Sequence, residues 1–208
     1  MRSLLVAAAC VAVATILAGE GTGAGVSLVL DNARVRVLKA RTGSAVADHP
    51  AAVVVVLEDG ATHKAGDAYW SGDPAAPRSG SDVGPIIIVE PKGPAPFAAP
   101  APGTAGGITP GPGPSTFVGM SFKPLLDNER VRVIRGRMEV GAREGFHTHA
   151  SDIVVVHLSG GAIEDTADGK TRVNHWKRGD VEFEPRGSSH SARNVGSAVD
   201  AVLVTLKP

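Results

Sequence analysis

Alternating apolar and polar residues recur along much of the chain and predict β-strands. Val131 and Val133 alternate with arginines, so one face of such a strand is apolar and the other is solvated. The run at 53–56 consists of valines only, as in a buried strand. Asp168 and Gly169 have the composition of a two-residue hairpin turn. Because no stretch of ten or more residues outside the N-terminus has helical periodicity, the pattern predicts an all-β fold.

The N-terminus has a different pattern. Arg2 precedes an uncharged apolar run at 4–18, which is shorter than the ~20 residues that a membrane-spanning helix needs. Small residues follow, so we expect a signal peptide over residues 1–24, cleaved after Ala24 or, alternatively, after Gly19. The competing interpretation is an uncleaved membrane anchor. The signal peptide predicts a secreted or periplasmic protein whose only membrane contact is this segment.

An internal repeat divides the rest of the chain. Leu30–Leu38 reappears as Leu126–Ile134 with seven of nine positions identical. The similarity predicts two related β units, 25–92 and 117–208. The first unit is short for an independent barrel, so we expect it to need the second unit or a partner chain, as in a homodimer, to complete its core.

A proline-rich segment separates the two units. More than half of the chain's 15 prolines lie between Pro91 and Ser115. Proline lacks the N–H group and fixes φ, which excludes a helix or a central strand. We therefore interpret residues 93–116 as a semi-extended linker on the surface.

Composition narrows the classes of partner. The chain has 21 Lys and Arg against 21 Asp and Glu, so it lacks the basic surplus of a general nucleic-acid binder. The 26 Gly and 15 Pro residues are typical of short strands joined by turns. With nucleic acid excluded as a general partner, we expect the partner to be a small-molecule ligand or substrate.

Three histidines carry the candidate chemistry. His147 and His149 are two residues apart, and in a strand such residues project from one face, where two imidazoles form half of a metal site. His190 follows a predicted strand and turn and is the best third ligand. Imidazole ligands suit Fe, Mn, Zn, Ni or Cu, and the spacing does not select one divalent ion among them.

The residues around these histidines resemble a known family. Gly141 to His149 reads G-x5-H-x-H, and Gly179 to Asn194 reads G-x5-P-x-G-x2-H-x3-N. Both resemble the signature motifs of the cupin superfamily (RmlC-like), and within it the small cupins known as β-alanine degradation proteins. The resemblance implies a double-stranded β-helix, or jelly-roll barrel, with the three histidines around one metal ion.

One departure from the family pattern concerns the acidic ligand. The usual glutamate would fall at 153–154, which is apolar here, whereas Asp152 lies one residue earlier. Since the set 152/154/156/158 is the more apolar below its first residue, we expect it to face inward. Asp152 would then be a metal ligand or the partner of one, the alternative being a turn cap. The same parity places His157 outside, and Glu182 and Glu184 are expected to be solvated.

The first unit has lost most of the motif. His49 remains, but Ala51 replaces the second histidine, and no histidine follows residues 70–73 in this unit, where the third ligand is expected. We therefore expect this unit to be a degenerate, structural cupin-like half. The sequence thus predicts an exported cupin-domain protein binding one divalent metal ion. Such a site could serve an enzyme acting on a small oxygenated substrate, a non-enzymatic small-molecule binder or a purely structural protein.

Overall fold

The computed structural model describes residues 25–41, 43–74, 76, 84–93, 108–110 and 116–208. The described residues form two antiparallel β-sheets and one short 3₁₀ helix, η1 (Gly43–Asp48), which confirms the predicted all-β class. None of their helices is long and apolar enough to cross a membrane. The expected signal peptide, 1–24, lies outside the described residues.

The first sheet has five strands in the order β1-β2-β5-β3-β4. These strands are β1 (Val26–Asp31), β2 (Val35–Ala40), β3 (Val53–Val56), β4 (Ala68–Trp70) and β5 (Ile86–Pro91). Its two edge strands do not pair with each other, so the described residues of the first unit form an open sheet, in line with its short length for an independent barrel. The central strands are buried on both faces, as their unbroken runs of β-branched residues predict.

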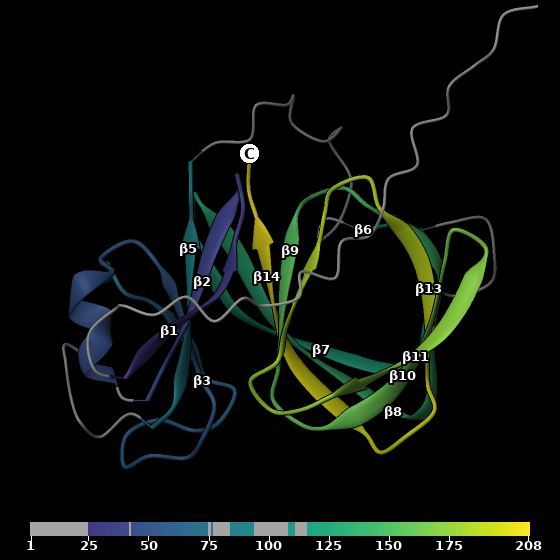
Figure 1. Cartoon of the computed structure of the whole chain (residues 1–208), viewed down its shortest axis with the longest axis horizontal. Helices are drawn as coiled ribbons and strands as arrows, with labels where there is room; N and C mark the ends of the chain where they lie inside the picture. Colours follow the sequence, from purple (N-terminus) through teal and green to yellow (C-terminus); the bar gives the residue numbers. More distant parts are fainter. Residues whose placement is uncertain (1–24, 42, 75, 77–83, 94–107, 111–115) are drawn as a thin grey trace, which may run out of the picture.

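The second sheet has nine strands. They are β6 (Ile108–Pro110), β7 (Phe117–Asp127), β8 (Val131–His149), β9 (Ile153–His157), β10 (Gly161–Ala167), β11 (Lys170–Trp176), β12 (Val181–Glu184), β13 (Ser189–Asn194) and β14 (Val199–Leu206). The main order is β11-β10-β13-β8-β14-β9-β12, and β6 and β7 also pair with β8. This sheet curls around on itself (Figure 1), as the cupin resemblance implies. The predicted turn at Asp168 and Gly169 joins β10 to β11, and both residues have the positive φ that a type I′ turn requires.

A bend in β8 turns the strand from one neighbour to another. Its residues 131–138 pair with β14, and residues 143–148 pair with β13. Between them, the partner strand β7 shifts register at Gly119, while Gly141 of the first motif adopts φ +76°. That conformation favours glycine because it lacks a Cβ. The bend brings the end of β8 alongside β13, where the histidines lie.

One hydrophobic core joins the two sheets. The first sheet contributes Val35, Val37, Val53, Val55, Leu57, Ile87 and Val89, and the second contributes Val131, Val133, Val154, Val156, Leu158, Val202, Val204 and Leu206. These side chains bury one face of each sheet against the other, and Figure 1 shows the two sheets lying side by side. The first unit therefore completes its core against the second, which is one of the two arrangements expected from its length.

The two similar nine-residue segments form the same turn. The Asn32 side chain accepts hydrogen bonds from the N–H groups of the residues two and three positions later, at 2.8 and 2.9 Å. Asn128 does the same, again at 2.8 and 2.9 Å. Each turn leads into a strand whose alternate valines enter the shared core. A common origin of the two units stays a prediction.

The proline-rich segment contributes a strand at its described part. Ile108 lies opposite His149 and Pro110 lies opposite His147 in an antiparallel pairing of β6 with β8. A proline is tolerated there because β6 has a neighbour on one side only. Residues 108–110 of the segment interpreted as a linker thus lie directly beside the strand that carries two of the candidate ligands.

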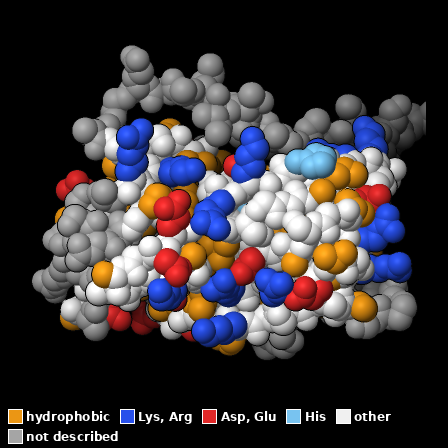
Figure 2. All heavy atoms as spheres, turned by 90° about the horizontal axis from the view of Figure 1, so that it is seen from below, with side chains coloured by type: hydrophobic (Ala, Val, Ile, Leu, Met, Phe, Trp, Pro, Cys, Tyr) orange, Lys and Arg blue, Asp and Glu red, His pale blue; other side chains and the backbone are white. Residues whose placement is uncertain are grey.

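The surface carries both charge signs. On the face shown in Figure 2, basic and acidic side chains of the described residues are interspersed with apolar ones. This distribution agrees with the balanced charge of the sequence. It offers no broad basic surface on that face for the phosphates of a nucleic acid.

Candidate metal centre

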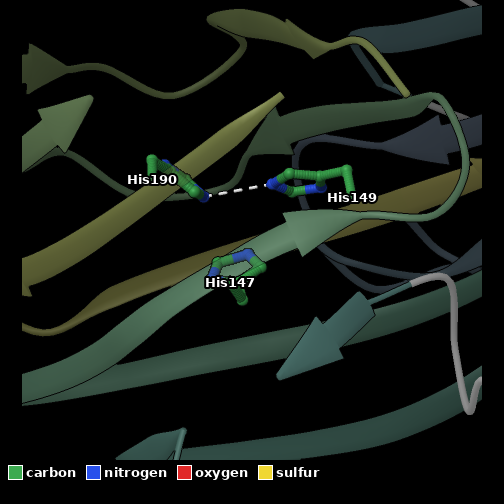
Figure 3. A group of neighbouring side chains, drawn as sticks. All are labelled: His147, His149 and His190. Atoms are coloured by element: carbon green, nitrogen blue, oxygen red, sulfur yellow. Dashed lines mark hydrogen bonds between the residues drawn. The ribbon is translucent and has the colours of Figure 1, made fainter. Parts of the chain in front are cut away.

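Two adjacent strands bring the three predicted histidines together. His147 and His149 lie at the end of β8, and His190 lies opposite His147 on β13. Figure 3 shows the three imidazoles turned toward one another. One nitrogen of each lies within 4.8 Å of the others, which makes the three histidines a group that could hold one metal ion. Among the described residues, no other group of His, Cys, Asp and Glu is arranged in this way.

Hydrogen bonds orient two of the three rings. His147 Nδ1 donates to the backbone oxygen of Gly145 at 2.9 Å, since a carbonyl only accepts. His190 Nδ1 donates to Asp165 Oδ1 on β10, also at 2.9 Å. Both rings therefore present Nε2 to the cluster, and a carbonyl or carboxylate behind a histidine is the usual support of a metal ligand.

The Nε2 atoms fit a metal ion better than they fit one another. His147 Nε2 is buried and has no hydrogen-bond partner among the described residues, and such an unpaired atom costs about 1–3 kcal/mol. His149 Nε2 lies 3.1 Å from His190 Nε2, so the two nitrogens share at most one proton. A divalent cation accepts all three lone pairs together, and the donor set fits it.

The histidines have opposite proton affinities. Burial, and then the charges of His190 and His147, lower the pKa of His149 to about 3. For His190, burial lowers the pKa, but the hydrogen bond to Asp165 and the negative charge of Glu184 outweigh it and raise the pKa to about 9. Without a cation the cluster holds a proton on His190. Metal binding then requires that this proton leave.

Carboxylates surround the cluster, and two of them were expected to be solvated. Glu184 lies 3.6 Å from His149 Nδ1 and 3.9 Å from His190 Nε2, and Glu144 lies 3.5 Å from His147 Nε2. Burial raises the pKa of Glu182 to about 7 and, together with the charge of Glu182, raises that of Glu184 well above its usual range. The expectation for Glu182 and Glu184 was wrong, because both side chains line the cavity beside the histidines.

Asp152 does not join the histidines. Its Oδ2 accepts a hydrogen bond from Arg34 Nε of the first sheet at 2.8 Å, and its Oδ1 accepts one from the Arg186 backbone N–H at 2.9 Å. The alternative role of a turn cap describes this geometry. Asp152 ties the first sheet to the turn that leads into β13, the strand of His190.

The face of β9 that lies toward the site is not the one expected from the sequence. Val154 and Val156 face the shared core between the sheets, whereas Ile153, Val155 and His157 line the cavity. The apolar face of β9 was therefore not the face toward the site. His157, expected at the surface, is 2% exposed.

The cavity extends from the histidines into the curled sheet and has a volume of about 100 Å³. His149, His190 and the nearby carboxylates form one part of its wall. Much of the remaining wall is apolar and includes Met120, Phe122, Met138, Val155, Ala201 and Leu203. A small molecule in this cavity would contact the candidate ligands and an apolar surface at once.

The histidine that remains from the metal-binding motif in the first unit has a different role. His49 follows η1, and its Nδ1 lies 2.6 Å from Glu90 Oε1. Ala51 stands at the position of the second histidine. His49 is thus engaged with a carboxylate and belongs to no three-residue cluster of the described chain.

Comparisons with known proteins give likenesses to solved structures, several of which are cupins by name. A cupin domain from Bordetella pertussis Tohama I is 27% identical, with a TM-score of 0.41, over 44% of this chain and 96% of its own. An RmlC-like cupin from Shewanella frigidimarina is 20% identical, with a TM-score of 0.37, over 43% and 78%. The polyketide cyclase RemF from Streptomyces resistomycificus is 16% identical, with a TM-score of 0.40, over 44% and 67%.

No protein-family profile and no curated protein matches the chain.

Proposed function

We propose that this protein is an exported, cupin-like protein that binds one divalent metal ion and a small oxygen-bearing molecule. His147, His149 and His190 would hold the ion through Nε2. The observation that carries the proposal is the convergence of these three nitrogens while Gly145 and Asp165 engage the opposite nitrogens of two rings. Arg2 and the apolar run 4–18 support export.

The surrounding residues would control what reaches the ion. The three imidazoles leave coordination positions open, and a divalent ion bound there acts as a Lewis acid or a redox centre toward an oxygen ligand. Glu184 is the nearest additional carboxylate to two of the histidines and is placed to accept or return a proton at Oε1 or Oε2. The apolar wall of the cavity limits access of water to this end.

A second candidate function is small-molecule binding without catalysis. The apolar part of the cavity favours it, because side chains such as Met120 and Phe122 can recognise a ligand without reacting with it. Both functions share the metal site, and they differ in whether a bound molecule is converted.

The metal content of the purified protein tests the metal site, which both candidate functions require. Protein purified without chelators is expected to contain one ion per chain by plasma emission spectrometry, or to take one up on dialysis. His149→Ala removes a central ligand and should lose stoichiometric binding. His49→Ala, a histidine of the first unit bonded to Glu90, should retain it. Wild-type protein that neither contains nor takes up an ion would contradict the metal site.

Export has its own measurement. Mass spectrometry of protein from the native host should show a mature N-terminus near Gly25. A full-length species confined to the cytosol would contradict export and leave the metal site untouched.

A further inference from the structure

A β-bulge in β8 places Glu144 on the strand face that carries the histidines. In the pairing of β8 with β13, His147 lies opposite His190. Glu144 lies opposite Ala192. The two residues of β8 are three positions apart and their partners only two, so β8 contains one extra residue between them. Without this bulge, strand alternation would turn residue 144 to the opposite face from His147. With it, Glu144 lines the cavity together with His190 and Ala192.

The contact between Glu144 and His147 brings two hydrogen-bond acceptors together. His147 Nδ1 donates to Gly145 O, so in the neutral ring Nε2 carries a lone pair. That nitrogen is buried, has no hydrogen-bond partner among the described residues and lies 3.5 Å from Glu144 Oε1. In a protonated ring, the Nε2–H group would face the carboxylate from beyond the roughly 2.7–3.2 Å of a hydrogen bond. A cation between the two atoms satisfies both.

The separation of these atoms fits two ligands of one ion. Zinc binds imidazole nitrogen and carboxylate oxygen at about 2.0–2.2 Å, so two tetrahedral ligand atoms lie roughly 3.4 Å apart. The 3.5 Å between Glu144 Oε1 and His147 Nε2 agrees with that value. His149 Nε2 and His190 Nε2, the pair joined in Figure 3, have a similar spacing of 3.1 Å. The His147 side chain is 0% exposed and that of Glu144 is 17% exposed, so solvent screens their contact little.

Glu184 has a different place in the site. Its Oε2 lies 3.6 Å from His149 Nδ1, whereas His149 faces His190 with Nε2. Glu184 thus lies behind the ring of His149, where a carboxylate commonly supports a metal ligand. Its Oε1 lies 3.9 Å from His190 Nε2, which is longer than the distance at Glu144. The distances therefore favour Glu144 as the carboxylate that meets the ion.

We propose that Glu144 is the fourth protein ligand of the metal ion, which then has three imidazoles and one carboxylate around it. The proposal rests on the metal site proposed above. It assigns the acidic ligand to a residue before the H-x-H pair, whereas the family pattern places that ligand after the pair, at 153–154. One coordination position fewer is then open to an oxygen ligand.

Glu144→Gln tests the assignment, with Glu182→Gln as the matched control. Glu182 lines the same cavity, so its variant removes a nearby negative charge but not the proposed ligand. Both are measured at pH 8, because burial raises the pKa of Glu182 to about 7 and the control must start from a charged residue.

Zinc affinity is measured by competition with a chelator, and zinc is chosen because it has no redox chemistry. Glu144→Gln should weaken binding by more than about 100-fold, since the loss of a residue that only supports a ligand already costs roughly 10–100-fold. Glu182→Gln should weaken it at least about tenfold less, because it removes only a charge. The visible absorption of cobalt(II)-loaded protein should change in Glu144→Gln and stay as in wild type in Glu182→Gln. Equal zinc affinities of the two variants, or an unchanged cobalt spectrum of Glu144→Gln, overturn the proposal.

Thermal unfolding of metal-free protein gives a measurement that does not depend on metal binding. The amide N–H of glutamine can donate to His147 Nε2, where the carboxylate offers only a second acceptor. Glu144→Gln should therefore raise the Tm by ~2–4 °C, the shift that one hydrogen bond gives in a chain of this size. A lowered Tm would show an ion pair with a protonated His147 and would overturn the assignment. Wild-type protein that binds neither zinc nor cobalt would contradict the metal site itself and the assignment with it.

Discussion

The two sheets share one face and differ on the other. Each turns its alternate valines into the common core, through strands that follow the same asparagine turn. Behind the first sheet, aliphatic side chains such as Leu38, Val54 and Ile88 pack together with residues near η1 in a core of their own. Behind the second sheet lies the cavity with its histidines. The same valine face can therefore belong to a sheet whose other face packs in a second hydrophobic core, or to one whose other face lines a cavity with histidines.

The comparison also shows how the halves depend on each other. The open first sheet has no other partner for its valine face among the described residues. In return, Arg34 of that sheet bonds Asp152 near the turn that leads to His190. The first unit, which lacks the histidine cluster, thus contacts the turn that positions His190 in the second unit.

The largest expected effect comes from a void in the shared core. Ile87→Ala should lower the free energy of unfolding by about 2–5 kcal/mol, because Ile87 is fully buried between the sheets. Trp70 and Trp176 lie in different sheets, so fluorescence of Trp70→Phe and Trp176→Phe backgrounds can follow each sheet separately. Both signals should shift to the same new midpoint.

Ile88→Ala is the matched control for that prediction. Ile88 is equally buried but faces the separate core behind the first sheet. Ile88→Ala should lower the free energy of unfolding by a similar amount. It tests whether the core behind the first sheet unfolds in the same transition as the shared core. Different midpoints for the two tryptophans in the parent protein would show that the sheets unfold independently and would break the comparison.

An intermediate effect concerns acid stability. Burial lowers the pKa of His157 from 6.5 to about 4, so the unfolded chain takes up a proton at this residue at a higher pH than the folded one. The contribution of the neutral ring is complete above pH 6.5 and is lost as the pH falls toward 4. The difference amounts to about 3 kcal/mol. In metal-free protein, the stability gap between His157→Phe and wild type should widen by up to that amount from pH 7 to pH 4.

Denaturant titrations at several pH values measure this widening. His175→Phe should follow wild type at each pH, because His175 is exposed. A gap that stays constant with pH would mean that His157 titrates as it does in the unfolded chain.

The smallest effect sharpens the role of Asp152. Asp152→Asn keeps the shape but removes the charge that meets Arg34, so it should cost about 1–2 kcal/mol of stability and leave the zinc content unchanged. Asp127→Asn, which weakens ion pairs of a more exposed carboxylate, should cost no more than about 1 kcal/mol. Loss of zinc in Asp152→Asn, measured by plasma emission, would return Asp152 to the metal site.

The sequence predicted the class of fold and the residues that meet, but not the direction of every strand face. The H-x-H spacing and the resemblance to the two cupin motifs together predicted that His147, His149 and His190 meet, because motif spacing follows strand geometry. For β9 and β12, alternation could not decide, since both faces of β9 are buried and both faces of β12 are half-buried. The apolar face of each packs toward the shared core, while His157, Glu182 and Glu184 line the cavity. The usual rule that apolar residues point into a barrel fails where a second sheet covers its outside.

The position of β14 sets the order in which the protein can fold. This strand comes last in the described chain, yet it lies between β8 and β9 in the middle of the second sheet. Until it is synthesised, β8 and β9 lack their shared neighbour, and the valine face of the first sheet lacks Val202, Val204 and Leu206. The apolar valine face of a growing chain therefore stays exposed during synthesis. It can be buried completely only after residues 199–206 have been translated.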